Sequence, residues 1–220
     1  VLVNHPQLRL GVLPLGTYNN FAKTLGIPLE IGQAVAVLLA ENTSKIDIGQ
    51  VNGYTFINNS GIGVYPYIVR HREWQQQQGK SKRFALLLAL GRALFYCPFL
   101  HLDFLLDGQK LSRRTPLVFI GNNEYILEGS EIGTRESLDK RTLSLFITHD
   151  INHFSFLALC LSIFFSRKDG LKTLDTITID QFTILSKKRI IRVSLDGEVT
   201  KLQTPLHYKI LPRALTVISA

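Results

Sequence analysis

The chain has 220 residues, of which 45% are hydrophobic and 19% charged, as expected of a folded protein that buries a substantial core. Its 25 lysines and arginines outnumber its 17 aspartates and glutamates, and the net charge of +8 favours nucleotides, nucleic acid or anionic lipid as partners. Scattered solvated charges remain an alternative reading, and without an aromatic-interleaved basic motif no nucleic acid is expected. The two cysteines lack the spacing of a zinc or redox motif, which indicates buried thiols in a reducing, cytoplasmic compartment.

The first 45 residues are expected to combine strand and helix. Residues 8–13 form a short apolar run, and Gly16 then breaks the pattern before a helical stretch over about residues 18–25. Apolar residues recur at helical spacing from residue 31 to about residue 42, which predicts a second, amphipathic helix.

From Ile46 onward the spacing becomes typical of strands. Asn52-Gly53 lies between two apolar runs and predicts a β-hairpin over residues 46–57. A helix is expected at residues 82–95, and strands are expected at residues 101–106, 117–121, 143–148, 176–185, 189–195, 206–211 and 215–219. The predicted fold class is therefore α/β plus mainly β, a remnant of an α/β layer joined near residue 45 to a larger antiparallel β domain.

Two further features concern the membrane and the start of the chain. The most apolar window covers residues 154–165, which is too short for a bilayer span of about 20 residues. It predicts a buried helix or, alternatively, a helix lying in the membrane interface. The chain begins with Val1 and contains no methionine, so we expect it to be a fragment of a longer protein.

The turn at Gly16 is the first place where chemistry is expected. A glycine after a strand lets the backbone approach a ligand, and the N-terminus of the following helix favours phosphate. Thr17 and Asn19 add polar side chains at the same point. The alternative is that one of these two residues simply caps the helix.

A second candidate site is the turn Asp196-Gly197. Asp-Gly between alternating runs is a strong signal for a type I′ hairpin, and a purely structural turn is the alternative. Glu198 follows at once, so two carboxylates at one turn could hold magnesium or accept a hydroxyl proton. Weaker signals are the glycines of residues 56–63 and the polar loop residues of 121–123 and 137–143.

The order and context of these motifs resemble the diacylglycerol kinase catalytic family, which is related to sphingosine and ceramide kinases and, more remotely, to NAD kinases. The similar stretches are Leu10-Gly-Val-Leu-Pro-Leu-Gly-Thr-Tyr-Asn-Asn-Phe-Ala-Lys-Thr-Leu-Gly-Ile-Pro28, Ile46-Asp-Ile-Gly-Gln-Val51, Phe56-Ile-Asn-Asn-Ser-Gly-Ile-Gly63, Phe119-Ile-Gly-Asn122, Asp196-Gly-Glu198 and Ile210-Leu-Pro-Arg-Ala-Leu215. The resemblance implies that residues 1–45 are the C-terminal part of an α/β nucleotide-binding domain. Residues 46–220 would form an antiparallel β-sandwich domain. In one version of this arrangement, its last strand packs with the first domain.

The resemblance also implies ATP-dependent transfer of the γ-phosphoryl group to a lipid hydroxyl. Glu198 would be the base that takes the hydroxyl proton, and magnesium would accompany ATP. The residues implied around the nucleotide are Gly16, Thr17, Asn19, Asn20, Asp196 and Gly197. The residues implied around magnesium are Ser137, Asp139 and Thr142.

The chain departs from the family pattern in three places. The family's Gly-Gly-Asp-Gly-Thr phosphate-binding loop is expected upstream of Leu10, where only nine residues stand, so activity of the 220 residues alone is left open. Many family members have aspartate where this chain has Asn20. Lys140 occupies the position of the metal-loop aspartate, and its charge would repel magnesium unless backbone carbonyls or Asp139 provide the ligands.

The leading interpretation is a cytoplasmic lipid kinase, peripheral at an anionic membrane surface, that acts on diacylglycerol in phospholipid metabolism. The main alternative is a non-catalytic module that binds lipid or anions and derives from the kinase fold. A kinase of the NAD-kinase type with a soluble substrate is a third reading. A sphingoid base, ceramide and phosphatidylglycerol are the alternative acceptors.

Overall fold

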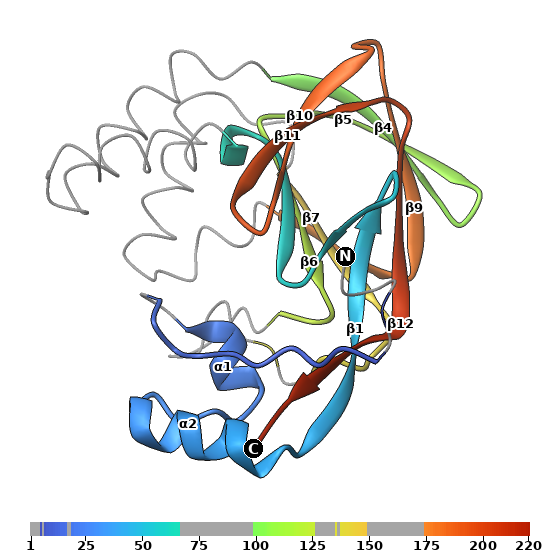
Figure 1. Ribbon diagram of the computed structural model, residues 1–220. Helices are drawn as coiled ribbons and strands as arrows, with labels where there is room; N and C mark the ends of the chain where they lie inside the picture. Colours follow the sequence, from blue (N-terminus) through green and yellow to red (C-terminus); the bar gives the residue numbers. More distant parts are fainter. Residues whose placement is uncertain are drawn as a thin grey trace, which may run out of the picture.

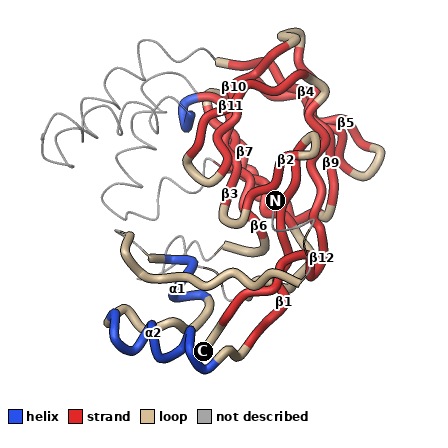
Figure 2. The backbone as a smooth tube through the Cα atoms, in the orientation of Figure 1, coloured by secondary structure: helices blue, strands red, loops and turns tan. Residues whose placement is uncertain are grey.

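The computed structural model describes residues 5, 7–16, 19–66, 99–125, 135, 137–148 and 174–220. In this part of the chain, two antiparallel six-stranded sheets face each other, and two helices lie at one end (Figures 1 and 2). The order of neighbouring strands is β2-β1-β12-β9-β4-β5 in the first sheet and β11-β10-β3-β6-β7-β8 in the second. The bounds are α1 Asn20–Thr24, α2 Ile31–Ala40, β1 Thr43–Val51, β2 Tyr54–Phe56, β3 Asn59–Gly63, β4 Leu100–Leu106, β5 Gln109–Thr115, β6 Leu117–Asn122, β7 Leu143–Thr148, β8 Leu174–Ile179, β9 Gln181–Ser186, β10 Ile190–Leu195, β11 Glu198–Gln203 and β12 Leu206–Ile218.

The main hydrophobic core lies between the two sheets. Val51 and Phe104 come from the first sheet, Ile120 and Leu145 come from the second, and all four side chains are completely buried. Strands with one face on such a core alternate between buried and exposed residues, as the first half of β12 does. The predicted antiparallel sandwich is therefore present.

The Asx-Gly pairs make the predicted hairpin turns. Both residues have positive φ in Asn52-Gly53 (47° and 86°) and in Asp196-Gly197 (49° and 97°), as a type I′ turn requires. Asp107-Gly108 repeats this geometry between β4 and β5. These turns set the register of three strand pairs.

Two strand predictions are wrong in their connectivity. Residues 176–185 form two strands, since β8 ends at Ile179, β9 begins at Gln181, and the two lie in different sheets. The chain changes sheet at Asp180 without glycine or proline, so the apolar alternation continues across the turn. Conversely, the strands expected at residues 206–211 and 215–219 are one continuous strand, β12, with Pro212 inside it.

β12 accommodates Pro212 by a bulge against β1. Ile46 pairs with Leu215, whereas Ile48 pairs with Leu211, so β12 has extra residues opposite Asp47. Arg213 lies in this bulge with φ of 51°. A bulge bends a strand and increases its twist, which lets β1 and β12 continue beyond the sandwich towards the helices (Figure 1).

A second, smaller core lies under α1 and α2. It joins Ala22 and Ala34 of the helices to Ile46 of β1 and to Leu215 and Val217 of β12. The two helices were predicted at about residues 18–25 and 31–42, and both are found with shorter bounds. α2 begins where the Glu30 carboxylate accepts hydrogen bonds from the first turn of the helix.

The strand expected at residues 8–13 is reduced to one bridge. Leu10 pairs in parallel with Val217, and its N–H donates to the Thr216 oxygen at 2.9 Å. The division of the chain near residue 45 stays a prediction. The helices expected at residues 82–95 and 154–165 lie outside the described residues, and no helix in the described part is long and apolar enough to cross a membrane.

Candidate functional site

The turn before α1 is closed by the side chain of Asn19. Its Oδ1 accepts a hydrogen bond from the Gly16 N–H at 2.8 Å, and its Nδ2 donates to the Pro14 oxygen at 3.1 Å. Asn19 has φ of 51° and makes no capping hydrogen bond to α1. Its amide therefore fixes the turn and does not cap the helix, while Asn20 begins α1 and Thr17 lies outside the described residues.

The turn at Asp196-Gly197 is held from within the protein. The Asp196 carboxylate accepts hydrogen bonds from the N–H groups of Ile57, Asn58 and Asn59 at 2.7, 2.7 and 3.0 Å. The Asp196 N–H donates to the Asn59 oxygen at 2.9 Å. These contacts fasten the β10–β11 hairpin to the segment between β2 and β3. The Asp196 carboxylate thus has a structural role that the sequence did not suggest.

Glu198 begins β11 and pairs with Leu195 of β10. Side chains of paired residues leave a sheet on the same face, and Leu195 packs against the main core. The next residue along this row is Ser60, whose hydroxyl bonds the buried Tyr208 hydroxyl at 2.9 Å. Glu198, Leu195 and Ser60 therefore form one row of side chains across three strands, on the face that packs against the core. Glu198 is exposed because its strand, β11, is at the edge of the sheet.

The segment 57–59 is also held through its carbonyl groups. The Ile57 oxygen accepts from Asn122 Nδ2 and from Arg135 Nη1, each at 2.9 Å. The Asn58 oxygen accepts from the Tyr125 hydroxyl at 2.9 Å and from the Asn122 N–H at 2.9 Å. Burial raises the pKa of Tyr125, so its hydroxyl keeps the proton that it donates.

Arg135 is a residue of this site that sequence reasoning missed. Only 5% of its surface is exposed, and its guanidinium lies 5.8 Å from the centre of the Phe21 ring and 5.4 Å from that of Tyr125. Burial lowers the pKa of Arg135, whereas Tyr125 and the Asp196 carboxylate act in the opposite direction. A single arginine outside any recognisable motif has no distinguishing spacing, so the sequence alone offered no signal for it.

The loop predicted to bind magnesium is tied to β1 by Asp47. This carboxylate is completely buried and accepts from the Arg141 N–H at 2.7 Å and from the Arg213 N–H at 2.8 Å. The Asp47 N–H donates to the Leu138 oxygen at 2.7 Å, and the Asp47 oxygen accepts from Asn122 Nδ2 at 2.9 Å. Asp47 therefore links the loop, the bulge of β12 and Asn122.

Within the loop, the one carboxylate, that of Asp139, precedes a cation in the sequence. Ser137 Oγ donates to Asp139 Oδ1 at 2.8 Å, and Lys140 beside it is exposed. Thr142 Oγ1 is buried with no hydrogen-bond partner in the structure. No group of three or more His, Cys, Asp or Glu among the described residues could hold a metal ion. The magnesium site of Ser137, Asp139 and Thr142 stays a prediction.

The structure brings the two ends of the predicted site into one set of contacts. The Phe21 ring of α1 lies against Arg135, Arg135 Nη2 donates to Asn58 Oδ1 at 2.8 Å, and the Asn58 N–H donates to Asp196. The metal loop joins the same set through Asp47 and Asn122. Phe21 and Asp196, which are 175 positions apart in the chain, are thus linked through one cation–π contact and a series of hydrogen bonds.

Comparisons with known proteins agree with this architecture. Residues 1–51 match the model of the diacylglycerol kinase catalytic domain. The whole chain is 28% identical, over 229 aligned residues, to a protein of Staphylococcus haemolyticus named as a putative lipid kinase and to one of Staphylococcus aureus MSSA476 with the same description. The chain spans 70% and 71% of the lengths of these relatives.

Solved structures with the same fold come from Bacillus anthracis str. Sterne. One, described as a diacylglycerol kinase, has a TM-score of 0.64 at 21% identity, with 96% of this chain and 67% of that chain covered. Another, described as a putative diacylglycerol kinase, has a TM-score of 0.69 at 22% identity, with 96% and 69% covered. At sequence identities of 21% and 22%, the similarity to these structures is evidence for a shared fold.

Proposed function

Since this chain is a relative of the diacylglycerol kinase catalytic family, we propose that the protein is a lipid kinase that transfers the γ-phosphoryl group of ATP to a lipid hydroxyl. The observation that carries the proposal is the set of contacts that joins α1, the helix after the Gly16–Asn19 turn, to the Asp196-Gly197 turn through Arg135 and Asn58. Phosphoryl transfer depends mainly on positioning and on charge, and such a network holds the relevant elements rigidly.

In this proposal the turn before α1 lies near the nucleotide, and Glu198 takes the proton of the attacking hydroxyl. Glu198 is suited to an apolar acceptor because it ends a row of side chains that faces the main core. Among the described residues, no hydrogen bond or ion pair occupies its carboxylate, so the carboxylate is available to a substrate. Diacylglycerol is the acceptor that we propose, from the descriptions of the family and of the solved structures.

The test is transfer of the labelled γ-phosphoryl group from ATP to diacylglycerol in mixed vesicles with magnesium. We expect labelled phosphatidate, with a rate that saturates in both substrates. Absence of transfer to diacylglycerol, a sphingoid base, ceramide and phosphatidylglycerol alike would remove the proposal.

Magnesium is proposed to arrive with the nucleotide phosphates, because the 137–142 loop offers one carboxylate beside Lys140. We expect the Lys140→Asp variant to bind Mg²⁺ about tenfold more tightly than the unchanged protein in the absence of nucleotide, since a repelling charge becomes a ligand. Isothermal titration with MgCl₂ measures this difference.

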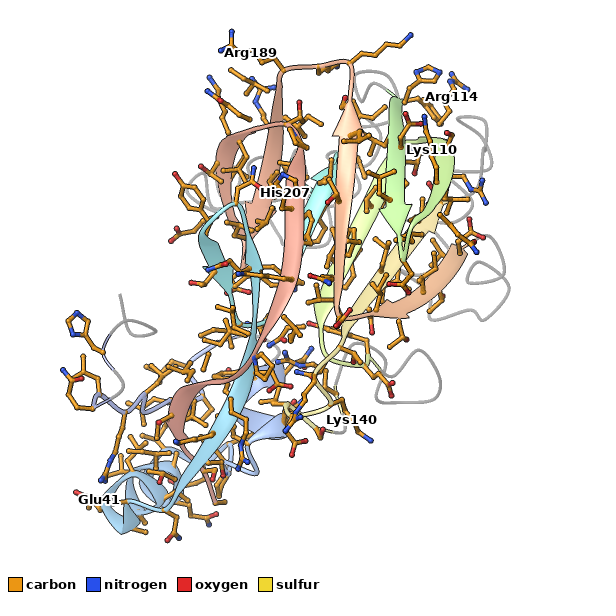
Figure 3. All side chains as sticks on the ribbon, turned by 90° about the vertical axis from the view of Figure 1, so that its right-hand side faces the viewer. Glu41, Lys110, Arg114, Lys140, Arg189 and His207 are labelled. Carbon is orange, nitrogen blue, oxygen red and sulfur yellow. The ribbon has the colours of Figure 1, made fainter. Side chains whose placement is uncertain are left out.

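Lys187→Asp is the matched control for this experiment. It makes the same charge change in the turn next to Arg189, at the end of the molecule opposite to Lys140 (Figure 3). Equal tightening in both variants would show that net charge, and not the 137–142 loop, governs magnesium binding.

The alternative function is a module that binds anionic lipid without catalysis. Lys140, Arg141 and Arg213 favour it, because all three are exposed and the backbone N–H groups of the two arginines meet at the Asp47 carboxylate. This reading predicts sedimentation with phosphatidylglycerol vesicles that weakens with salt, without binding of ATP. Saturable ATP binding would exclude it. Association with an anionic membrane surface is also part of the kinase proposal, so nucleotide binding and not vesicle binding separates the two.

A further inference from the structure

Arg135 contacts one short segment of the chain with both of its terminal nitrogens. Nη1 donates to the Ile57 oxygen at 2.9 Å and to the Asn122 oxygen at 3.3 Å, and Nη2 donates to Asn58 Oδ1 at 2.8 Å. A guanidinium presents its donors in a fixed planar fork, so these bonds define the position of the segment as well as stabilise it.

Asp196 holds the same segment from the opposite side. Its carboxylate accepts the N–H groups of Ile57, Asn58 and Asn59, while the Ile57 oxygen is bound by Arg135. The peptide group between Ile57 and Asn58 therefore lies between the two charges, because its oxygen accepts from Arg135 and its N–H donates to Asp196. Hydrogen bonds that involve an ionised partner are shorter and stronger than neutral ones, so the arrangement is rigid.

We propose that Arg135 is a positioning residue for the phosphoryl transfer, which fixes Glu198 by holding the 57–59 segment on which the Asp196 turn is seated; this inference rests on the proposed kinase function. Glu198 follows Asp196 by two residues, with only Gly197 between them. Gly197 has φ of 97° and nothing within 4 Å of the place where a side chain would begin. The turn thus has little packing at Gly197, and it is held to the 57–59 segment by the carboxylate and the N–H of Asp196.

Arg135 also contacts the nucleotide end of the proposed site. Its guanidinium lies 5.8 Å from the centre of the Phe21 ring in α1, the helix that follows the turn fixed by Asn19. The Arg135 guanidinium therefore helps to set the distance between the turn before α1 and the hairpin that carries Glu198. Transfer of a phosphoryl group requires the attacking hydroxyl and the nucleotide to lie in line, so this spacing bears directly on the rate.

Arg135 is not placed to bind the substrate itself. It is 5% exposed, and its described hydrogen bonds go to two backbone oxygens and one side-chain amide. A phosphate could reach the guanidinium only by displacing these acceptors. Its influence on the reaction is consequently expected in turnover and not in ATP affinity.

The experiment measures kcat and KM for ATP and for lipid in the Arg135→Lys variant. Lysine keeps the charge but loses the fork, so it cannot hold the Ile57 oxygen and Asn58 Oδ1 together. We expect kcat to fall about 30- to 100-fold, the size of effect that a displacement of about 1 Å produces, while KM for ATP changes less than about twofold. Guanidinium ion added to an Arg135→Ala variant is expected to restore part of the lost kcat.

Arg113→Lys is the matched control. Arg113 Nε donates to Asp175 Oδ2 at 3.0 Å on the sheet edge, at 30% side-chain exposure, so the same chemical change is made away from the proposed site. We expect its kcat to stay within about twofold of the unchanged protein, as for surface ion pairs in general.

A milder variant tests the inference if Arg135→Lys does not fold. Tyr125→Phe removes only the hydroxyl that donates to the Asn58 oxygen, and we expect kcat to fall about three- to tenfold, as for one lost hydrogen bond. Hydrogen exchange is measured on the same samples. The amides of Ile57, Asn58 and Asn59 are expected to exchange faster, whereas those of β1 and β12 keep their rates.

The outcomes separate this inference from the proposed function. If the unchanged protein phosphorylates no lipid, the proposed function fails and the inference fails with it. If it is active and both variants keep its kcat, Arg135 does not position Glu198, although the kinase function stands. Loss of kcat with faster exchange throughout β1 and β12 would show a general structural role and would also overturn the inference.

Discussion

The Glu198→Gln variant is expected to phosphorylate diacylglycerol about 10²- to 10⁴-fold more slowly than the unchanged protein, the usual contribution of a general base. Glutamine has nearly the same size but cannot take a proton from the attacking hydroxyl. Glu198 is exposed at the start of β11, and its side chain makes no hydrogen bond or ion pair to another described residue, so the fold should persist. Initial rates at saturating ATP and lipid measure the effect, and circular dichroism checks the fold.

Glu124→Gln is the matched control, because Glu124 is another exposed glutamate and its replacement removes the same charge. Its activity is expected to remain within about twofold, since surface substitutions of this kind have small effects. Equal loss in both variants would point to a general effect of negative charge, such as attraction of Mg²⁺, and not to proton transfer. Full activity of Glu198→Gln would exclude Glu198 as the base of the proposed reaction.

Local patterns predicted much of the β domain. The hairpins at Asn52-Gly53 and Asp196-Gly197 depend on two adjacent residues that tolerate positive φ, so the sequence carries their signal within a few positions. The strands β4, β6 and β7 were predicted for the same reason, because each alternates or forms a compact apolar run. The turn at Asp180 was missed because it has no such local signal.

The candidate site was predicted only in part, because its geometry arises from contacts between distant residues. Asp196 and Glu198 were identified from one turn, but the three N–H groups that hold Asp196 belong to residues 137 to 139 positions earlier. Arg135 bonds to Ile57 across 78 positions. Such pairings leave no periodicity in a single sequence, and only the folded chain brings them together.

The loop predicted to bind magnesium, residues 137–142, is fastened to the candidate site by contacts of its backbone. Residues 137–142 do lie next to the network of the candidate site, through Asp47 and Asn122. Yet Lys140 stands where the resemblance implies the metal-loop aspartate, and a second cation, Arg141, follows it. The backbone of the loop is therefore anchored to the site independently of whether a metal is bound, since the Asp47 carboxylate provides the anchor.

That anchor leads to the second large effect, on stability. The Asp47→Asn variant is expected to lower the free energy of unfolding by about 3 kcal/mol, a large share of the roughly 5–15 kcal/mol of a typical domain. Both carboxylate oxygens accept backbone N–H groups, those of Arg141 and Arg213, and Asp47 is completely buried. An amide has one acceptor oxygen, so its NH₂ group would face one of the two N–H donors whichever way it turned. Urea denaturation followed by fluorescence measures the change.

Asp103→Asn is the control that separates the effect of burial from that of losing a carboxylate. Asp103 also accepts hydrogen bonds, from Ser112 Oγ and Lys110 Nζ, but it lies at the surface of β4. Water can replace those partners, so this variant should unfold at nearly the same urea concentration as the unchanged protein. If Asp47→Asn is equally mild, the Arg141 and Arg213 N–H groups must find other acceptors, and the carboxylate is not what holds the metal loop to β12. If Asp47→Asn strongly lowers the free energy of unfolding, we expect faster hydrogen exchange at the amides of Leu215 and Val217 and in the 137–142 loop. The reason is that the bulge beside Asp47 lies where β12 passes from the main core to the core under the helices.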